Sequence, residues 1–210
     1  MAMVRRVGRP CQSDAVETRR RILDGARESF TTRGYDNTTN REIADAAGIT
    51  AAAIYHYFPS KVELFVAVFI DVQHKVYDRF ESVMAEHDTF LARFDAIFDA
   101  MFELSKDDPT LASFVVGVVT EAQHHPDLRE ALQSVSSRQQ NFLHTLCKQA
   151  QERHELPESL PLQTAIDAMS GVVGGFARLA VVVRDRQRLR AVAKVYKAMA
   201  RSALARAAAN

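Results

Sequence analysis

The chain of 210 residues has little cysteine, no tryptophan and few of the residues that interrupt helices. Two cysteines are too few for a disulfide framework or a cysteine-rich zinc site, and eight glycines with six prolines leave room for long helices. A long apolar run is also missing, because Arg178 interrupts residues 170–183 and a membrane-spanning helix needs roughly 18 continuous residues. The N-terminal arginines precede no apolar segment, so no secretory signal is predicted. The chain is therefore expected in the cytoplasm, with no membrane partner.

The net charge is only +1, but the charges are unevenly distributed along the chain. Residues 1–62 carry ten basic and seven acidic side chains, residues 63–183 carry nine and eighteen, and residues 184–210 carry eight and one. Positive surface attracts nucleic acid, whereas strongly acidic surface repels it. The N-terminal part is therefore a candidate for binding nucleic acid, and the acidic middle is expected to have another role.

Helical periodicity covers almost the whole sequence. Apolar side chains recur every three or four residues, and prolines 109, 126 and 161 stand where first-turn prolines are common. No alternation of period two between turn residues indicates a strand. The predicted fold is all-α with about nine helices, at residues 14–33, 39–47, 51–57, 60–86, 89–105, 109–124, 126–155, 161–183 and 186–207.

Residues 39–57 have the pattern of a helix-turn-helix. Thr39 and Glu42 form a capping box at the start of the first helix, and Gly48 permits the positive φ of a tight turn. Thr50 can then cap the second helix. Such a pair presents its second helix to the major groove of DNA. From this spacing alone, an ordinary helical hairpin stays open as the alternative.

The residues around this turn resemble a known family. The resemblance rests on the runs Thr38-Thr39-x-Arg41-Glu42-Ile43-Ala44-x-x-Ala47-Gly48-Ile49 and Ile54-Tyr55-His56-Tyr57-Phe58-Pro59-Ser60-Lys61-x-x-Leu64. Together they are similar to the DNA-binding domain of the TetR family of bacterial transcriptional regulators. The resemblance implies an all-helical homodimer, with an N-terminal three-helix DNA-binding domain and a larger C-terminal domain that binds a small effector and dimerises.

By position, the resemblance also implies which residues contact double-stranded DNA. Tyr55, Tyr57 and Lys61 match phosphate contacts, Thr39 and Thr50 match helix starts near the backbone, and Arg41 matches a base or backbone contact. Hydroxyls, an ammonium group and helix N-termini are suitable phosphate donors, which set the register of the protein without discriminating sequence.

The second helix departs from the family pattern at residues 51–53, which are three alanines where relatives commonly have lysine, glycine or polar residues. Ala51 and Ala53 can offer only methyl contact to thymine. Discrimination between bases is then expected from Arg41, His56 and the N-terminal arm, or from DNA shape. Arg9 in that arm is expected in a minor groove, with a solvated tail as the alternative.

The acidic middle of the chain contains a phenylalanine at every fourth position from 90 to 102. Because ligand sites between bundle helices are mostly apolar, we expect a pocket for a small lipophilic effector, with plain core as the alternative. Glu121 is a candidate polar contact, and Arg178 could anchor a carboxylate or an acyl thioester, or extend to solvent. The expected apolar lining residues are Phe94, Phe98, Met101, Phe102, Phe114, Val118, Phe142, Leu146, Met169 and Val173.

The last two predicted helices have small and aliphatic faces. Glycine inside a helix costs about 1 kcal/mol relative to alanine, so the glycines at 171, 174 and 175 indicate close helix approach. We expect these helices to form a four-helix dimer interface, with an intramolecular seam as the alternative. The expected dimerisation residues are Gly171, Gly175, Leu189, Val192, Tyr196, Met199 and Leu204.

No catalytic motif is evident. Glu121 and His124 have the spacing of two ligands in di-iron bundles, but the further carboxylates that such a site needs are missing. No nucleophile elbow, phosphate loop or zinc spacing is present. We therefore expect neither an enzyme nor a cofactor, and keep a helical-bundle metal enzyme and a lipid carrier without DNA binding as alternatives.

Together these observations predict three parts. Residues 1–13 are expected to form a basic flexible arm, residues 14–62 a helix-turn-helix DNA-binding domain, and residues 63–210 a helical effector-binding and dimerisation domain. The predicted function is that of a ligand-responsive transcriptional regulator, a repressor that is released from a palindromic operator by a small lipophilic effector.

Overall fold

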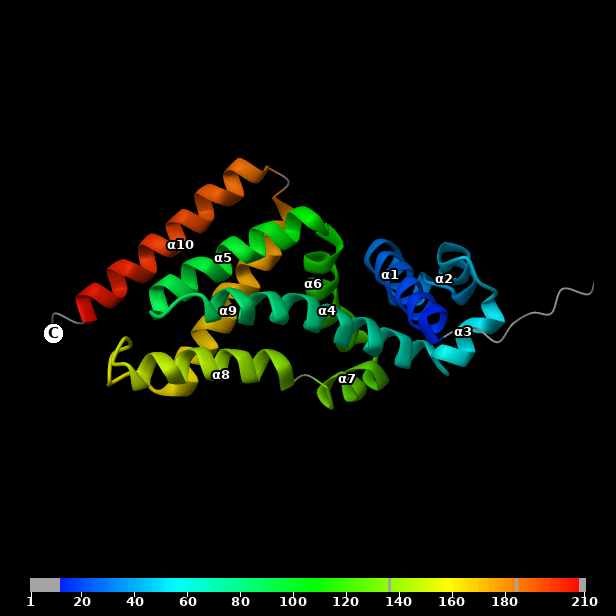
Figure 1. Cartoon of the computed structure of the whole chain (residues 1–210), viewed down its shortest axis with the longest axis horizontal. Coiled ribbons are helices and arrows are strands. Elements are labelled where there is room, and N and C mark those ends of the chain that lie inside the picture. Colours follow the sequence, from blue (N-terminus) through cyan, green and yellow to red (C-terminus); the bar gives the residue numbers. More distant parts are fainter. Residues whose placement is uncertain (1–11, 136, 184, 208–210) are drawn as a thin grey trace, which may run out of the picture. The chain divides into compact units, whose positions relative to one another are not determined.

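The computed structural model describes residues 12–135, 137–183 and 185–207, and these residues form ten helices and no strand (Figure 1). The predicted all-α class is confirmed. The predicted arm lies almost wholly outside the described residues, and so does Arg9. The helices are α1 Gln12–Asn37, α2 Asn40–Ala47, α3 Ala51–Tyr57, α4 Lys61–Ala85, α5 Phe90–Asp107, α6 Pro109–His124, α7 Pro126–Gln133, α8 Ser137–Glu152, α9 Leu162–Val182 and α10 Arg186–Ala207.

The tenth helix arises because the predicted helix at residues 126–155 is divided into α7 and α8. The Ser134 hydroxyl donates to the carbonyl of Ala131 at 2.7 Å, and the amide of Val135 donates to the carbonyl of Leu132 at 3.1 Å. These short-range bonds close a turn after α7. Serine side chains compete with the helical hydrogen bonds in this way, although no proline or glycine marks the break.

The first of two compact units comprises residues 1–68 and contains α1, α2, α3 and the first turns of α4. Its centre is aromatic: the rings of Phe30 and Phe65 lie 5.0 Å apart, and those of Tyr35 and Phe65 lie 5.5 Å apart. Because Phe65 of α4 packs on these rings, the unit includes the first turns of α4 as far as Val68, whereas the sequence suggested a boundary at residue 62.

The second unit, residues 69–210, contains the remainder of α4 together with α5 to α10. Helices α6 and α8 pack on α9, and α10 packs on α5. Ring contacts connect the helices: Tyr77 of α4 lies 5.4 Å from Phe142 of α8, and Phe98 of α5 lies 5.0 Å from Phe176 of α9. The core of this unit is thus built from several helices that are distant in sequence.

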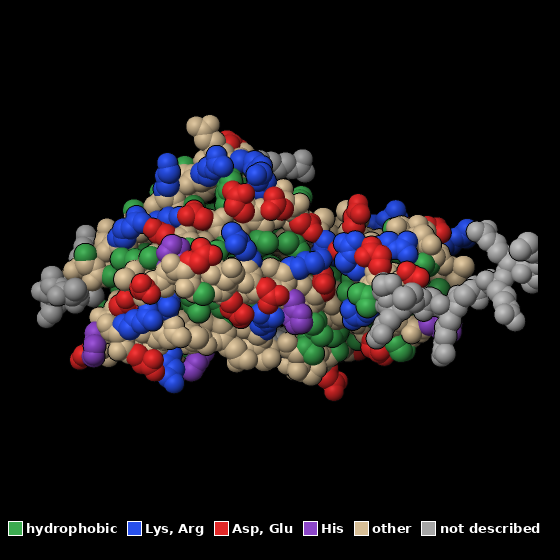
Figure 2. Space-filling view, in the orientation of Figure 1, with side chains coloured by type: hydrophobic (Ala, Val, Ile, Leu, Met, Phe, Trp, Pro, Cys, Tyr) green, Lys and Arg blue, Asp and Glu red, His purple; other side chains and the backbone are tan. Residues whose placement is uncertain are grey.

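The basic C-terminal segment lies against an acidic stripe of its own chain. The Lys197 ammonium is 2.7 Å from Asp99 Oδ1, and Arg201 pairs with Asp95. Figure 2 shows basic and acidic side chains side by side over the surface where α5 and α10 lie in Figure 1. Charge blocks that are separate in the sequence therefore become one mixed surface.

One described helix, α9, is long and apolar enough to cross a membrane, and a second passes that test only if the bent pair α3 and α4 is counted as one span. An 18-residue window of α9 has a mean hydropathy of 1.5, although the charged residues Asp167 and Arg178 lie within it. The large apolar side chains of α9 are mostly buried or half-buried in its own chain, and its exposed positions are mostly small or polar.

Candidate DNA interface and effector cavity

The predicted capping box at the start of α2 is present in both halves. The Thr39 hydroxyl oxygen accepts the backbone N–H of Glu42 at 3.3 Å, and Glu42 Oε2 accepts the backbone N–H of Thr39 at 3.1 Å. Two amides at the helix start are satisfied reciprocally. The entry into α2 is therefore fixed by local hydrogen bonds.

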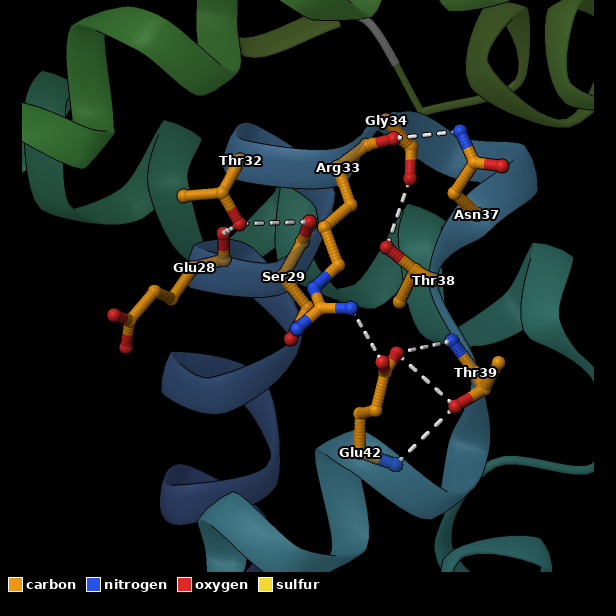
Figure 3. Close-up of polar contacts among 9 residues, drawn as sticks. All are labelled: Glu28, Ser29, Thr32, Arg33, Gly34, Asn37, Thr38, Thr39 and Glu42. Carbon is orange, nitrogen blue, oxygen red and sulfur yellow. Dashed lines mark hydrogen bonds and ion pairs between the residues drawn. The ribbon is translucent and has the colours of Figure 1, made fainter.

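Glu42 also connects α2 to the end of α1 (Figure 3). Nη1 of Arg33 lies 2.5 Å from Glu42 Oε1. The hydrogen bonds from the backbone and the hydroxyl of Thr39, with the charge of Arg33, hold the pKa of Glu42 below its ordinary value of 4.5. The carboxylate is thus ionised at neutral pH, where it accepts bonds from both helices.

Gly34 interrupts the helical backbone of α1 with φ 78° and ψ 173°. The carbonyls exposed by this break are satisfied nearby, since Thr38 Oγ1 donates to Gly34 O at 2.8 Å and Asn37 Nδ2 donates to Arg33 O at 3.1 Å (Figure 3). The helix predicted to end at residue 33 therefore continues past a kink at Gly34 to Asn37.

The turn between α2 and α3 depends on Gly48, which has φ 66° and ψ 36°. Its N–H donates to the carbonyls of Ala44 and Asp45, which ends α2. A β-carbon at this position would be strained by the backbone and would lie 3.3 Å from an Arg21 nitrogen. The next helix begins at once, because Thr50 Oγ1 accepts the amide of Ala53 at 3.3 Å.

The residues predicted to contact DNA lie on α2, α3 and the start of α4. Thr39, Arg41, Thr50, Tyr55 and His56 are exposed, and Tyr55 is 57 % accessible. The half-buried members of the set are Ala51, Ala53, Tyr57 and Lys61. On the opposite side of α3, Ile54 is buried in the unit core. Helix α3 thus offers one exposed face to a partner.

Lys61 makes contacts within its own unit. Its ammonium group donates to the carbonyl of Asp36 at 3.2 Å and lies 4.6 Å from the centre of the Tyr35 ring. Both partners lie near the end of α1. The sequence pattern did not predict their contact with residue 61. The side chain is positioned before any DNA is bound.

The second unit contains an apolar cavity of about 100 Å³ between α4, α5, α6, α8 and α9. Two predicted effector residues, Met101 and Val173, line it. The sequence missed Gln73, although it stands four residues after Phe69 and four before Tyr77 on the apolar stripe of α4. The full lining is Val72, Gln73, Val76, Tyr77, Phe80, Met101, Leu104, Ser105, Leu111, Ala112, Val115, Gln139, Val173, Gly174, Phe176, Ala177 and Ala180.

The other predicted effector residues lie elsewhere. Phe142 lines an open groove of about 630 Å³ beside α4 and α8, and Gln73 lines the same groove. Glu121 lies 3.5 Å from His125 Nε2, and Arg178 is exposed to solvent. The remaining residues are buried in the core without lining the cavity, namely Phe94, Phe98, Phe102, Phe114, Val118, Leu146 and Met169.

The predicted dimerisation residues divide into two groups. Leu189 is buried in its own chain, and Val192, Tyr196 and Leu204 pack against the core of the second unit. These four therefore lie in an intramolecular seam, because the apolar face of α10 is turned toward α5 and α9. Gly175 lies beside this seam, where a β-carbon would be 4.0 Å from the Tyr196 hydroxyl.

The second group faces outward. Met199 is 61 % accessible, and Val182 and Val195 are also exposed. Around Gly171 and Gly174 there is open space, since a β-carbon at either position would meet nothing within 4 Å. The outward faces of α9 and α10 thus combine small and apolar residues.

The predicted di-iron spacing has no surrounding ligand set. Within the described residues, no group of three or more histidine, cysteine, aspartate or glutamate side chains could hold a metal ion. His124 is exposed, and its Nδ1 lies 2.8 Å from the carbonyl oxygen of Thr120 on the same helix.

Comparison with known proteins matches both units. Residues 22–68 match the family model described as bacterial regulatory proteins, tetR family, and residues 84–181 match the model described as tetracyclin repressor-like, C-terminal domain.

Two curated relatives come from Pseudomonas putida. The chain is 28 % identical over 181 residues to the HTH-type transcriptional regulator SrpR, a match that covers 86 % of this chain and 83 % of that protein. It is 29 % identical over 194 residues to the HTH-type transcriptional regulator TtgR, a match that covers 87 % of each. Among solved structures, the transcriptional regulator FadR from Bacillus subtilis, in complex with stearoyl-CoA, has a TM-score of 0.76 and 21 % identity over 86 % of this chain and 96 % of that chain.

Proposed function

Because the chain belongs to the TetR family of bacterial transcriptional regulators, we propose that it is a homodimeric repressor that leaves a palindromic operator when a small lipophilic effector binds. The observation that carries this proposal is the α2-turn-α3 segment, in which both helix starts are capped and α3 is exposed on one face. Such a geometry fits a recognition helix in a major groove about 12 Å wide.

The exposed groups around α3 are suited to the DNA backbone. The Tyr55 hydroxyl, the Arg41 guanidinium and the N-terminal amides of α3 can donate to phosphates, and Tyr57, Lys61, Thr39 and Thr50 flank them. Because Ala51 and Ala53 offer only methyl groups, we propose that Arg41, His56, Arg9 of the arm and DNA shape supply most of the discrimination.

We propose that the outward faces of α9 and α10 pack against the same faces of a second copy. The exposed positions of α9 include Ala168, Gly171 and Gly174, small residues that permit close helix approach. The exposed Asp167 and Arg178 on α9 would be costly in lipid, which favours a protein partner over a membrane. A dimer would place two recognition helices in successive major grooves, roughly 34–36 Å apart in the simplest arrangement.

The cavity of the second unit supports an apolar effector. FadR of Bacillus subtilis was solved with stearoyl-CoA, so one protein of this fold holds a lipophilic molecule. A ligand shifts the equilibrium between two forms only by its different affinity for each. We propose that the effector binds better to the form that does not fit the operator. The curated relatives are transcriptional regulators, and we propose no catalytic role.

The test is to sequence genomic DNA fragments that the purified protein retains. We expect enriched fragments with an inverted repeat. The variant Arg41→Ala should lose about 10-fold or more in affinity for them, since one good base or charged contact contributes about 1–3 kcal/mol.

The matched control is Arg129→Ala, which removes another exposed arginine from the short helix α7 of the second unit. It should retain DNA like the parent protein. If no fragment is enriched over the input, or if both variants lose DNA equally, the proposed function is wrong.

A further inference from the structure

The cavity of the second unit is lined entirely by uncharged side chains. Five helices contribute to it, yet none of the lining side chains is a lysine, arginine, aspartate, glutamate or histidine. Tyr77 is neutral at physiological pH, and burial raises the pKa of its phenol further above the ordinary value. A carboxylate or phosphate placed here would lose its hydration without gaining a cationic partner. The lining therefore selects against charged ligands.

One polar group in this lining stands out. Gln73 is only 9 % exposed, and its side-chain oxygen Oε1 is shielded from solvent without a hydrogen-bond donor among the described residues. The other lining amide, Gln139, differs, since its Nε2 donates to Ser170 Oγ at 3.3 Å. Buried carbonyl oxygens in folded proteins almost always accept a hydrogen bond. Gln73 thus combines a place in the cavity wall with a buried oxygen to which the described residues offer no donor.

We propose that this cavity binds an uncharged, largely apolar molecule of about the size of one aromatic ring, whose hydroxyl group bonds the side-chain amide of Gln73. The volume of about 100 Å³ is of the order of apolar cavities that accept benzene. A hydroxyl both donates and accepts, so it suits either end of the amide. This inference rests on the proposed function, because it takes the cavity as the effector site and names the chemical class of the effector.

The size and lining also separate this ligand from two other classes. A coenzyme A thioester carries several phosphates, for which the lining offers no cation. A carboxylate anchored by Arg178 would lie elsewhere, since that side chain is exposed and does not line the cavity. The effector class is therefore set by Gln73 and its apolar neighbours.

The experiment measures the binding of three probes to the full-length protein without DNA. Phenol carries the hydroxyl, fluorobenzene has nearly the same shape without a donor, and benzoate is charged at neutral pH. We expect calorimetry and fluorine NMR to show binding of phenol and fluorobenzene, and displacement of fluorobenzene by phenol. Benzoate should not bind. Binding of benzoate as tight as that of phenol, or no binding of any probe, would overturn the proposal.

The variant Gln73→Leu tests the hydrogen bond. It should lower the affinity for phenol about tenfold relative to that for fluorobenzene, which is the effect expected of one buried hydrogen bond. Binding of fluorobenzene should be retained. The matched control is Gln140→Leu, which makes the same replacement at an exposed position of α8 outside the cavity. An unchanged preference in Gln73→Leu would overturn the role of Gln73. If that variant does not fold, the ranking of the three probes on the parent protein decides.

A second variant tests the place of binding. Ala177→Phe adds a ring to the lining and should abolish fluorobenzene binding, and its failure to do so would overturn the cavity as the site. DNA retention is measured separately on probe-free protein. Phenol binding without DNA retention would refute the proposed function alone, whereas DNA retention without phenol binding would refute this inference alone.

Discussion

At the residue scale, Glu42 is the carboxylate on which the recognition segment depends. It accepts the backbone N–H and the hydroxyl of Thr39 and pairs with Arg33 at the end of α1. All three partners bond its ionised form. The stability that they confer should therefore depend on pH.

We predict that Glu42→Gln lowers the stability of the protein at neutral pH and loses this effect in acid. The folded pKa of Glu42 is below 4.5, so its contribution is complete above that value and is lost as pH falls through the lowered pKa. Urea midpoints of the parent and variant should differ at about pH 7 and converge toward about pH 3. Glu130→Gln, on the exposed surface of α7, is the control and should show no such convergence.

Cys147 gives a second prediction at this scale. Its side chain is fully buried, and burial raises the pKa of the thiol to about 11. Only about one molecule in a thousand would carry the thiolate at pH 8. In a Cys11→Ser background, Cys147 should react with a thiol reagent at least about a hundredfold faster in urea than in native protein. Equal rates in both conditions would contradict its burial.

The residue scale also shows what the sequence could predict. Thr39, Glu42, Gly48 and Thr50 were predicted because capping and turn chemistry act over three or four positions. The contacts of Lys61 with Asp36 and Tyr35 could not be predicted in the same way, since they join segments 25 residues apart. Local chemistry is visible in a sequence, whereas tertiary contact is not.

At the element scale, α9 and α10 illustrate the same limit. Amphipathic spacing indicates the apolar face of a helix but not what covers it. Leu189, Val192, Tyr196 and Leu204 were expected at a dimer interface, and they pack on the core of their own chain. The outward face of α9 is instead marked by glycine. Its role can be tested by adding single methyl groups.

We predict that Gly171→Ala weakens the dimer. Within one chain a β-carbon at this position meets nothing within 4 Å, so alanine should fit and should favour the helix by about 1 kcal/mol. Against a closely packed second copy, the added methyl group should raise the dimer dissociation constant about tenfold, measured by sedimentation.

Gly117→Ala is the matched control, since Gly117 in α6 also has open space around it. It should gain thermal stability without changing the dimer. If Gly171→Ala behaves like Gly117→Ala, the face of α9 is free in solution and the dimer interface lies elsewhere.

At the scale of the whole molecule, the two units differ in how far the sequence predicted them. The DNA-binding unit was predicted in its helices and turn, because its motif is continuous in sequence. Met101 and Val173 of the cavity lining were predicted, but the cavity as a whole was not, because five helices assemble it and Gln73 stands alone within an apolar stripe. A single glutamine in a helix pattern is usually solvent-facing, and only the packing shows otherwise.

We predict that effector and operator weaken each other equally. If a compound lowers operator affinity by a given factor, saturating operator must lower the affinity for that compound by the same factor, typically about 5- to 150-fold. Calorimetric titration with the compound, in the absence and in the presence of retained DNA, measures the change in affinity for the compound. Titration with the DNA, in the absence and in the presence of the compound, measures the change in affinity for the operator. A compound that releases DNA while its own affinity is unaffected by DNA would exclude release by a shift between two forms.

The alanines of α3 have a further consequence for how operators and regulators diverge. Ala52 is exposed on the recognition helix, and Ala51 and Ala53 are half-buried beside it. One nucleotide change in an alanine codon gives serine, threonine, aspartate or glutamate, each of which adds a hydrogen-bonding group. A lineage carrying this protein can therefore acquire a new base preference in one mutational step at Ala52, without first discarding an older contact and with little effect on folding.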